Sequence, residues 1–181
     1  ETYDTVNSTI GQGYVLVNPT QLAVMASRLA SGRIITPKFQ FDKGRGVAPP
    51  LGVSQQHLDI IHNAMKDVVN RNGTARGAQM KVPGIVLAGK TGSAQVRRIT
   101  MAERRGGVRG DAALPFKLRD HALFIGFAPF DKPRYAVGCV LEHSHANGSA
   151  SGSASDTLSY LFDRDIAMAK LTTLEAGWGG T

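Results

Sequence analysis

Two patterns of chemically useful residues overlap on one lysine in the middle of the chain. Residues 84–91 fit the phosphate-loop pattern G-x-x-x-x-G-K-[ST] at every position. Lys90, Thr91 and Gly92 also form the K-T-G triplet that serine acyl-transferases use. The first pattern predicts phosphate binding and the second predicts acyl transfer, so only one of them can describe this segment.

The neighbouring residues favour a strand over a phosphate loop. A phosphate loop needs flexible backbone between its glycines, whereas residues 85–88 read Ile-Val-Leu-Ala and prefer an extended conformation. It also needs a helix that begins at Lys-Thr, but Gly92 follows at once and Val96 comes soon after. A nucleotide-binding protein that uses Gly84 to Thr91 stays open as the alternative, and a helix directly after Thr91 would favour it.

On a strand, the triplet predicts one side of an acyl-transfer site. Alternation points Lys90 and Gly92 to one face and Thr91 to the other. An ammonium group beside a serine nucleophile favours its ionised form, and a threonine hydroxyl can donate to a substrate carboxylate. Gly92 lets substrate approach the backbone, and the N–H of Ser93 can donate to a developing oxyanion. These four residues are the candidate site.

Two helices are predicted upstream of this strand. The first begins at Asn18 as N-cap with Pro19 in the first helical position, and it ends at Gly32. The second begins at Ser54 and ends at the Arg71 to Gly73 turn. Their apolar stripes recur at helical spacing; they comprise Leu22, Met25, Ala26 and Leu29 in the first and Leu58, Ile61, Met65, Val68 and Val69 in the second.

A β-hairpin and a final helix are predicted downstream. Residues 122–128 and 135–141 are apolar at nearly every position and flank a turn at 131–133, so both faces of the hairpin should be covered. Residues 144–155 are rich in Ser, Ala and Gly and predict a flexible connector. A helix over 156–171 follows, with Leu158, Leu161, Phe162, Ile166 and Ala169 as its buried face. The order predicts an α+β fold, an antiparallel sheet with helices packed on it.

Composition limits the class of protein. The 181 residues are 42% hydrophobic and 19% charged, which indicates a globular domain, and no apolar run approaches the length of a membrane span. One cysteine excludes an intramolecular disulfide and a Cys-rich zinc site.

Residues 97–109 carry five Arg and one Glu, which predicts an exposed, mobile loop. This loop lacks interleaved aromatic residues, so nucleic acid is not the expected partner.

Other polar residues receive structural interpretations. Glu142, His143 and His145 contain ligand types for zinc, but their Ser- and Gly-rich surroundings favour solvated histidines, and no metal site is predicted. Cys139 lies among valines and is interpreted as a small core residue. Asp120 and His121 are expected to be structural.

Four stretches together resemble the transpeptidase domain of class B penicillin-binding proteins, most closely those of the elongation type. The stretches are Ile10-Gly11-Gln12-Gly13-Tyr14 with Asn18-Pro19-Thr20-Gln21-Leu22, residues 89–96, Arg119-Asp120-His121-Ala122-Leu123-Phe124 with Phe127-Ala128-Pro129, and Ala136-Val137 with Leu141-Glu142-His143. They occur in the family's order and spacing over nearly the whole chain. The resemblance implies the penicillin-binding protein and β-lactamase-like fold.

The resemblance also implies an activity. Members of this family cross-link peptidoglycan: a serine attacks the D-Ala–D-Ala bond of one stem peptide, and the acyl group passes to an amine on another. β-Lactams mimic the donor and trap the serine. Members work at the periplasmic face of the cytoplasmic (inner) membrane, held by an anchor helix, beside a membrane glycosyltransferase of the elongation complex. The resemblance implies no cofactor and makes Lys90 the third-motif lysine, Thr91 the carboxylate ligand and Ser93 N–H half of the oxyanion hole.

The chain departs from the family at its nucleophile. No serine in the sequence has Lys three residues later or Asn two residues later, so the S-x-x-K and S-x-N motifs are missing. We therefore expect residues 1–181 to be the C-terminal portion of a transpeptidase domain, inactive alone, with the nucleophile-bearing part upstream. Unpaired strand edges should then cause self-association. A non-catalytic cell-wall scaffold module stays open as a further alternative.

Overall fold

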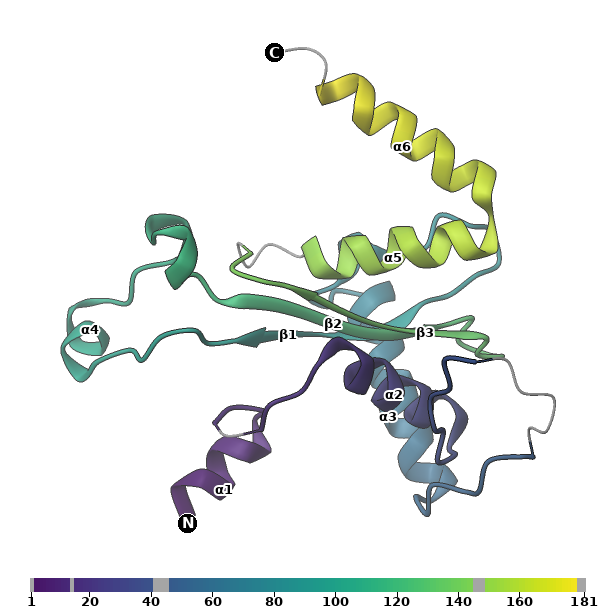
Figure 1. Cartoon of the computed structure of the whole chain (residues 1–181), viewed down its shortest axis with the longest axis horizontal. Helices are drawn as coiled ribbons and strands as arrows, with labels where there is room; N and C mark the ends of the chain where they lie inside the picture. The colour runs from purple at the N-terminus through teal and green to yellow at the C-terminus, as the bar shows by residue number, and fades with distance from the viewer. Residues whose placement is uncertain (1, 14, 41–45, 145–148, 179–181) are drawn as a thin grey trace.

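The computed structural model describes residues 2–13, 15–40, 46–144 and 149–178. Its centre is an antiparallel sheet in the order β1 (Ala88–Ala94), β2 (His121–Ala128), β3 (Tyr135–Leu141). Helices α2 (Pro19–Ser31) and α3 (Gln55–Asn70) cover one face, and α5 (Ser149–Phe162) covers the other (Figure 1). The α+β prediction, an antiparallel sheet with packed helices, is confirmed.

Both upstream helices begin where the sequence predicts. The Asn18 side chain accepts a hydrogen bond from the Gln21 N–H, and the Gln21 side chain accepts one from the Asn18 N–H, which closes a capping box. Gly32 ends α2 with φ 62°, a left-handed conformation that suits glycine. Ser54 Oγ accepts from the His57 N–H at 3.3 Å and caps α3.

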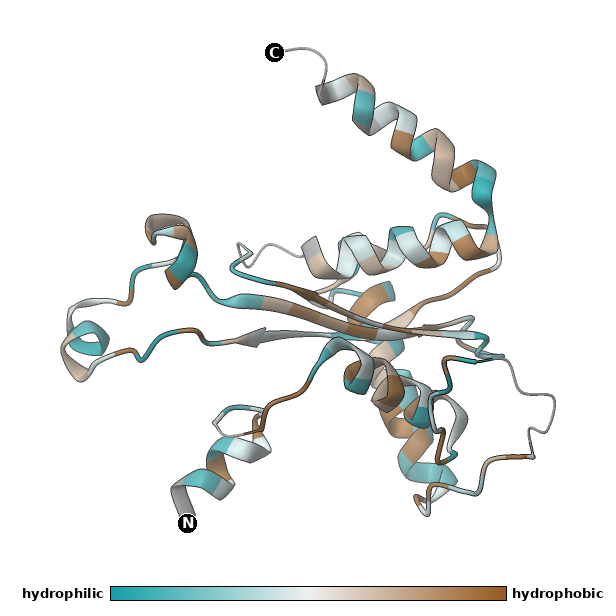
Figure 2. Ribbon diagram, viewed as in Figure 1, coloured by the Kyte–Doolittle hydropathy of each residue, from teal (hydrophilic) through white to brown (hydrophobic). Residues whose placement is uncertain are grey.

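The core has one layer on each face of the sheet. On the α5 side, the layer contains Phe124 and Leu158 and also Val69 from the last turn of α3, and all three are almost fully buried. On the α2 and α3 side, Phe127 packs with Met65. Figure 2 shows the apolar colouring along β2 and β3 between these helices. The predicted covering of both hairpin faces is confirmed, because successive β2 side chains enter opposite layers.

The C-terminal prediction is wrong in two places. Helix α5 begins at Ser149, inside the predicted connector, and a separate helix α6 (Arg164–Trp178) follows it. Ser, Ala and Gly are typical of linkers, but here they form a helix face that packs closely on the sheet. The buried members of this face are Ala150, Ser151, Ala154, Ser155, Leu158 and Ser159.

Asp163 separates the two C-terminal helices. Its side chain accepts hydrogen bonds from the N–H groups of Asp165 and Ile166, as an N-cap does. Because the chain changes direction there, Leu161 and Ala169 are exposed rather than buried, contrary to the prediction. Figure 1 shows α6 leaving the body of the molecule.

Some local structure was not predicted. Helix α1 (Thr2–Thr9) has no sequence-based counterpart, and Met25, expected in a buried stripe, is 44% exposed. The Arg-rich segment contains a short helix, α4 (Met101–Gly106), capped by Thr100. Three 3-10 turns complete the elements: η1 (Arg76–Ala78), η2 (Asp111–Ala113) and η3 (Phe116–Leu118).

Candidate active site

The outer edge of β1 carries the candidate site. Strand β1 pairs only with β2 among the described residues, so its other edge has no partner strand there. Three carbonyl groups of this segment accept hydrogen bonds from side chains: Leu87 from Asn70 Nδ2 at 2.7 Å, Thr91 from the neighbouring Lys90 Nζ at 2.8 Å and Ser93 from Gln12 Nε2 at 3.1 Å. Since the N–H and C=O of one residue face the same side of an antiparallel strand, the Ser93 N–H faces this edge too.

Strand register separates the candidate side chains between two faces. Lys90 lies opposite Ile125, which packs toward α3. Thr91 lies opposite Phe124 in the layer under α5. The predicted alternation, with Lys90 on one face and Thr91 on the other, is therefore confirmed. The Lys90 side chain is exposed and bends back along the edge of its own strand.

Thr74 joins the site and was missed by the sequence analysis. Its Oγ1 lies 2.7 Å from the Thr91 Oγ1, and either hydroxyl can be the donor. The two threonines line one hollow together with Gly92 and Ser93. When Thr74 donates, the Thr91 hydroxyl keeps its own hydrogen for a ligand. Thr74 follows α3 by a polar turn and lies 17 residues before Thr91, so no local pattern pointed to it.

Gln12 is the second residue whose contact was missed. The Gly11-Gln12-Gly13 turn was noted as a motif, but no role was predicted for its side chain. Both glycines have positive φ, 73° and 91°, and the turn carries Gln12 to the Ser93 carbonyl, 81 residues away in sequence. This bond fixes the end of β1 where the candidate oxyanion donor lies.

The phosphate-loop alternative is wrong. Strand β1 continues through Lys90 and Thr91 to Ala94, and no helix begins at Thr91. A phosphate loop would need the N-terminus of a helix there to face the anion. The apolar residues at 85–87 lead into the strand, although the strand itself begins only at Ala88.

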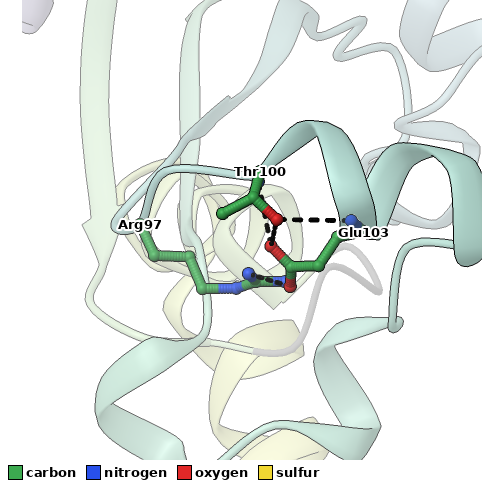
Figure 3. A network of polar contacts seen from close by, with 3 residues as sticks. All are labelled: Arg97, Thr100 and Glu103. Carbon is green, nitrogen blue, oxygen red and sulfur yellow. Dashed lines mark hydrogen bonds and ion pairs between the residues drawn. The ribbon is translucent and has the colours of Figure 1, made fainter.

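A polar network holds the first half of the Arg-rich segment (Figure 3). Arg97 Nη1 donates to Glu103 Oε1 at 2.7 Å. Glu103 Oε2 accepts from the N–H and the hydroxyl of Thr100 at 2.9 and 3.1 Å. The Thr100 N–H, followed by the Arg97 guanidinium, lowers the pKa of Glu103 below its ordinary value. Glu103 is therefore held as a carboxylate.

The remaining polar candidates support the sheet ends. Asp120 Oδ1 accepts from the Val96 N–H at 3.2 Å, and His121 Nδ1 accepts from the His143 N–H at 2.9 Å. Both contacts fit the structural interpretation of Asp120 and His121. His145 lies outside the described residues, and within the described residues no three metal-ligating side chains gather.

Cys139 fits its interpretation as a core residue. It packs at the border of the core layer on the α5 side of the sheet. Burial raises the pKa of its thiol, so the reactive thiolate is disfavoured.

Comparison with known proteins decides the family. The penicillin binding protein transpeptidase domain matches residues 2–160. The chain belongs to this family. Within this family, the chain is similar to the peptidoglycan D,D-transpeptidase MrdA of Acinetobacter baumannii, with 32% identity over 87% of this chain and 24% of that protein. The Escherichia coli K12 MrdA is 31% identical over 82% of this chain and 24% of its own length. The chain thus spans about a quarter of these curated relatives.

Solved structures agree with this membership. The penicillin-binding protein PBP2 of Helicobacter pylori, solved in complex with MreC, matches with a TM-score of 0.70 and 27% identity over 89% of this chain and 28% of that one. PBP2 of Pseudomonas aeruginosa, solved in complex with WCK 5153, has a TM-score of 0.62 and 30% identity over 88% of this chain and 33% of that one. The family resemblance found in the sequence is confirmed.

Proposed function

We propose that the protein to which this chain belongs is a serine-type peptidoglycan D,D-transpeptidase that cross-links stem peptides during cell-wall elongation and is inhibited by β-lactams. One observation carries the proposal: the free edge of β1 offers an ammonium group, a hydroxyl and an outward N–H within four consecutive residues, Lys90 to Ser93. Membership in the transpeptidase family supports the same conclusion.

Each candidate residue has a proposed role in acyl transfer. A serine hydroxyl loses its proton to a base and attacks the carbonyl carbon of the D-Ala–D-Ala bond, and the Ser93 N–H stabilises the oxyanion. Collapse of the intermediate breaks the peptide bond, and the terminal D-Ala leaves as a protonated amine. An amine of a second stem peptide then attacks the acyl-enzyme and releases the serine. Lys90 supplies positive charge beside the serine.

Thr91 and Gly92 have proposed roles in substrate binding. The Thr91 hydroxyl donates to the terminal carboxylate of the donor peptide, and the hydrogen bond with Thr74 orients it. A side chain at Gly92 would stand between the strand and the peptide, so glycine allows their close approach. The two hydroxyl groups and the Ser93 N–H would then hold the donor along the edge of β1.

We further propose that residues 1–181 form the C-terminal portion of the domain, that the nucleophile lies upstream, and that this portion alone is inactive. We place the whole protein at the periplasmic face of the inner membrane, with an anchor outside this chain; none of the described helices has the length and apolarity to cross a bilayer. Its proposed partners are a membrane glycosyltransferase and a protein of the MreC kind, which binds the Helicobacter pylori relative.

Intact mass spectrometry after exposure to a reactive penicillin tests the proposal. The 181-residue chain is run beside a longer chain extended upstream through the S-x-x-K and S-x-N motifs. We expect an adduct on the longer chain only. An adduct on the short chain would make one of its own serines the nucleophile and overturn the assignment of roles. No adduct on either chain would contradict transpeptidation and favour a cell-wall scaffold module.

The role of Lys90 is tested in the longer chain. Lys90→Met should slow adduct formation by about 10²- to 10³-fold, because it removes positive charge from the site. Lys132→Met is the matched control, since Lys132 is an exposed lysine in the β2–β3 turn. Acylation of Lys90→Met at the rate of the control would show that this ammonium group does not act in the reaction.

A further inference from the structure

The segment that connects β1 to β2, residues 95–120, projects from the sheet as an arm that carries α4 near its tip (Figure 1). We call it the basic arm. It contains seven Lys and Arg against three Asp and Glu, a net charge of +4 out of +7 for the whole chain. More than half of the excess positive charge therefore lies in one excursion that begins directly after the candidate site.

The acidic side chains of the arm form hydrogen bonds with other residues of the arm. Glu103 binds Arg97 and Thr100, Asp111 accepts from the Asp120 N–H at 3.3 Å, and Asp120 accepts from the Val96 N–H. These bonds tie the outgoing limb to α4 and to the returning limb. The carboxylates thus shape the arm and leave most of its arginines without an acidic partner.

Four arginines of the arm are free to bind an external anion. Arg98, Arg104, Arg105 and Arg109 are all exposed, and none of them forms an ion pair with a described residue. The chain from residue 68 to residue 102 contains no Asp or Glu, so no carboxylate of that stretch opposes the positive field between Lys90 and the arm. Asp120 accepts from the Val96 N–H at the base of the arm, and the arm as a whole keeps a net charge of +4.

We propose that these four arginines bind carboxylate groups of the anionic glycan-peptide strand beyond the stem peptide that occupies the β1 edge. This inference rests on the proposed function and names a second substrate contact outside the acyl-transfer site. Each stem peptide that has not been cross-linked ends in a carboxylate, and the planar guanidinium group binds carboxylates through two parallel hydrogen bonds. Because the arm begins where β1 ends, an extended strand that leaves the β1 edge in that direction would reach it (Figure 1).

Other anionic partners fit the arm less well. Single-stranded nucleic acid would need aromatic side chains for stacking, and Phe116 is the only one in residues 95–120. A membrane surface would need a helix with an apolar face, whereas α4 has six residues and one large apolar side chain, Met101.

Binding of soluble, uncross-linked peptidoglycan strands to the 181-residue chain tests the inference. The charge-neutralising double variant Arg104→Gln/Arg105→Gln is compared with Lys132→Gln/Arg164→Gln, which removes the same charge from exposed residues outside the arm. We expect about tenfold weaker binding for the arm variant and little change for the control. The two double variants should bind strands with amidated carboxylates with equal affinity.

Three results would overturn the inference: equal weakening by both double variants, unchanged binding of amidated strands, or arm-dependent binding of anionic phospholipid vesicles without binding of soluble strands. Penicillin acylation of the longer chain is measured separately. Failure of acylation with arm-dependent strand binding intact would count against the proposed transpeptidation alone. Acylation without arm dependence of strand binding would count against the arm alone.

Discussion

At the scale of single residues, the hydroxyl pair of Thr74 and Thr91 is the most informative contact. An isolated hydroxyl rotates freely, whereas one that accepts a hydrogen bond from its neighbour has its own hydrogen directed away from that neighbour. The exposed Thr74 adds little to the core, so its effect should be on the direction of the Thr91 hydrogen. A substitution at Thr74 should therefore change substrate positioning without changing the stability of the fold.

Thr74→Val should slow acylation of the longer chain by a β-lactam that carries a free carboxylate, about tenfold, because one directing hydrogen bond is lost. Thr74→Ser keeps the hydroxyl and should retain the wild-type rate. The esterified form of the same β-lactam should react equally with all three proteins. Equal rates for Val and Ser variants with the free carboxylate would contradict the positioning role.

Glu103 gives a pH prediction for the basic arm. Because its folded-state pKa is lowered, the Thr100 and Arg97 contacts add stability above the ordinary pKa of 4.5, and this is lost as pH falls through the folded value. Amide hydrogen-exchange protection over residues 100–106 should therefore be constant from neutral pH down to about the ordinary pKa of 4.5 and should fall at lower pH. Glu103→Gln should abolish this pH dependence; a dependence that persists in the variant would assign it to another group.

At the scale of elements, α2 packs unusually close to β3. A Cβ built on Gly138 would lie 2.6 Å from the Pro19 carbonyl oxygen and 2.8 Å from the Ala23 nitrogen. Backbone at this distance cannot give way as a flexible side chain does. The absence of a side chain at Gly138 is thus what lets the first turns of α2 rest on the sheet.

Gly138→Ala should lower the free energy of unfolding by about 1–3 kcal/mol, since it forces α2 and β3 apart. Gly152→Ala is the matched change in α5, where a new Cβ would meet nothing within 4 Å. That variant should gain about 0.5–1 kcal/mol from helix propensity. Urea denaturation measures both; equal midpoints for Gly138→Ala and wild type would contradict the close packing of α2 on β3.

Elements with strong local signals were predictable from sequence. The Asn18 and Ser54 caps located the starts of α2 and α3, and residues 122–141 located the hairpin. Helix α5 was missed because Ser and Ala are read as linker residues unless the surface that buries them is known. Local pattern placed Thr91 and Ser93 on a strand. It could not predict the contact of Thr91 with Thr74 or that of Ser93 with Gln12, because these partners are distant in sequence.

At the scale of the whole molecule, apolar surface remains uncovered. The outer edges of β1 and β3 have no partner strand among the described residues. Between α1 and α2, Val15, Leu16 and Val17 are exposed, with Leu16 at 88%, and this segment has apolar colouring in Figure 2. Phe39 is 94% exposed. Free strand edges beside apolar surface recruit other chains.

The 181-residue chain should therefore self-associate. Light scattering coupled to size exclusion should give masses above the 19.3 kDa of one chain, rising with concentration. If the upstream part covers the same surfaces, the longer chain should form assemblies that contain fewer copies, as measured by light scattering. A 19.3 kDa monomer at all concentrations would contradict the prediction.

The contact between α2 and β3 also sets the order in which the protein can fold. More than one hundred residues separate Pro19 from Gly138, whereas β1, β2 and β3 follow one another and pair with their neighbours. Sequential pairing closes shorter loops, so the sheet can form early. During synthesis, α2 leaves the ribosome well before β3, so the part of α2 that rests on β3 stays uncovered until that strand emerges and is open to wrong contacts until then.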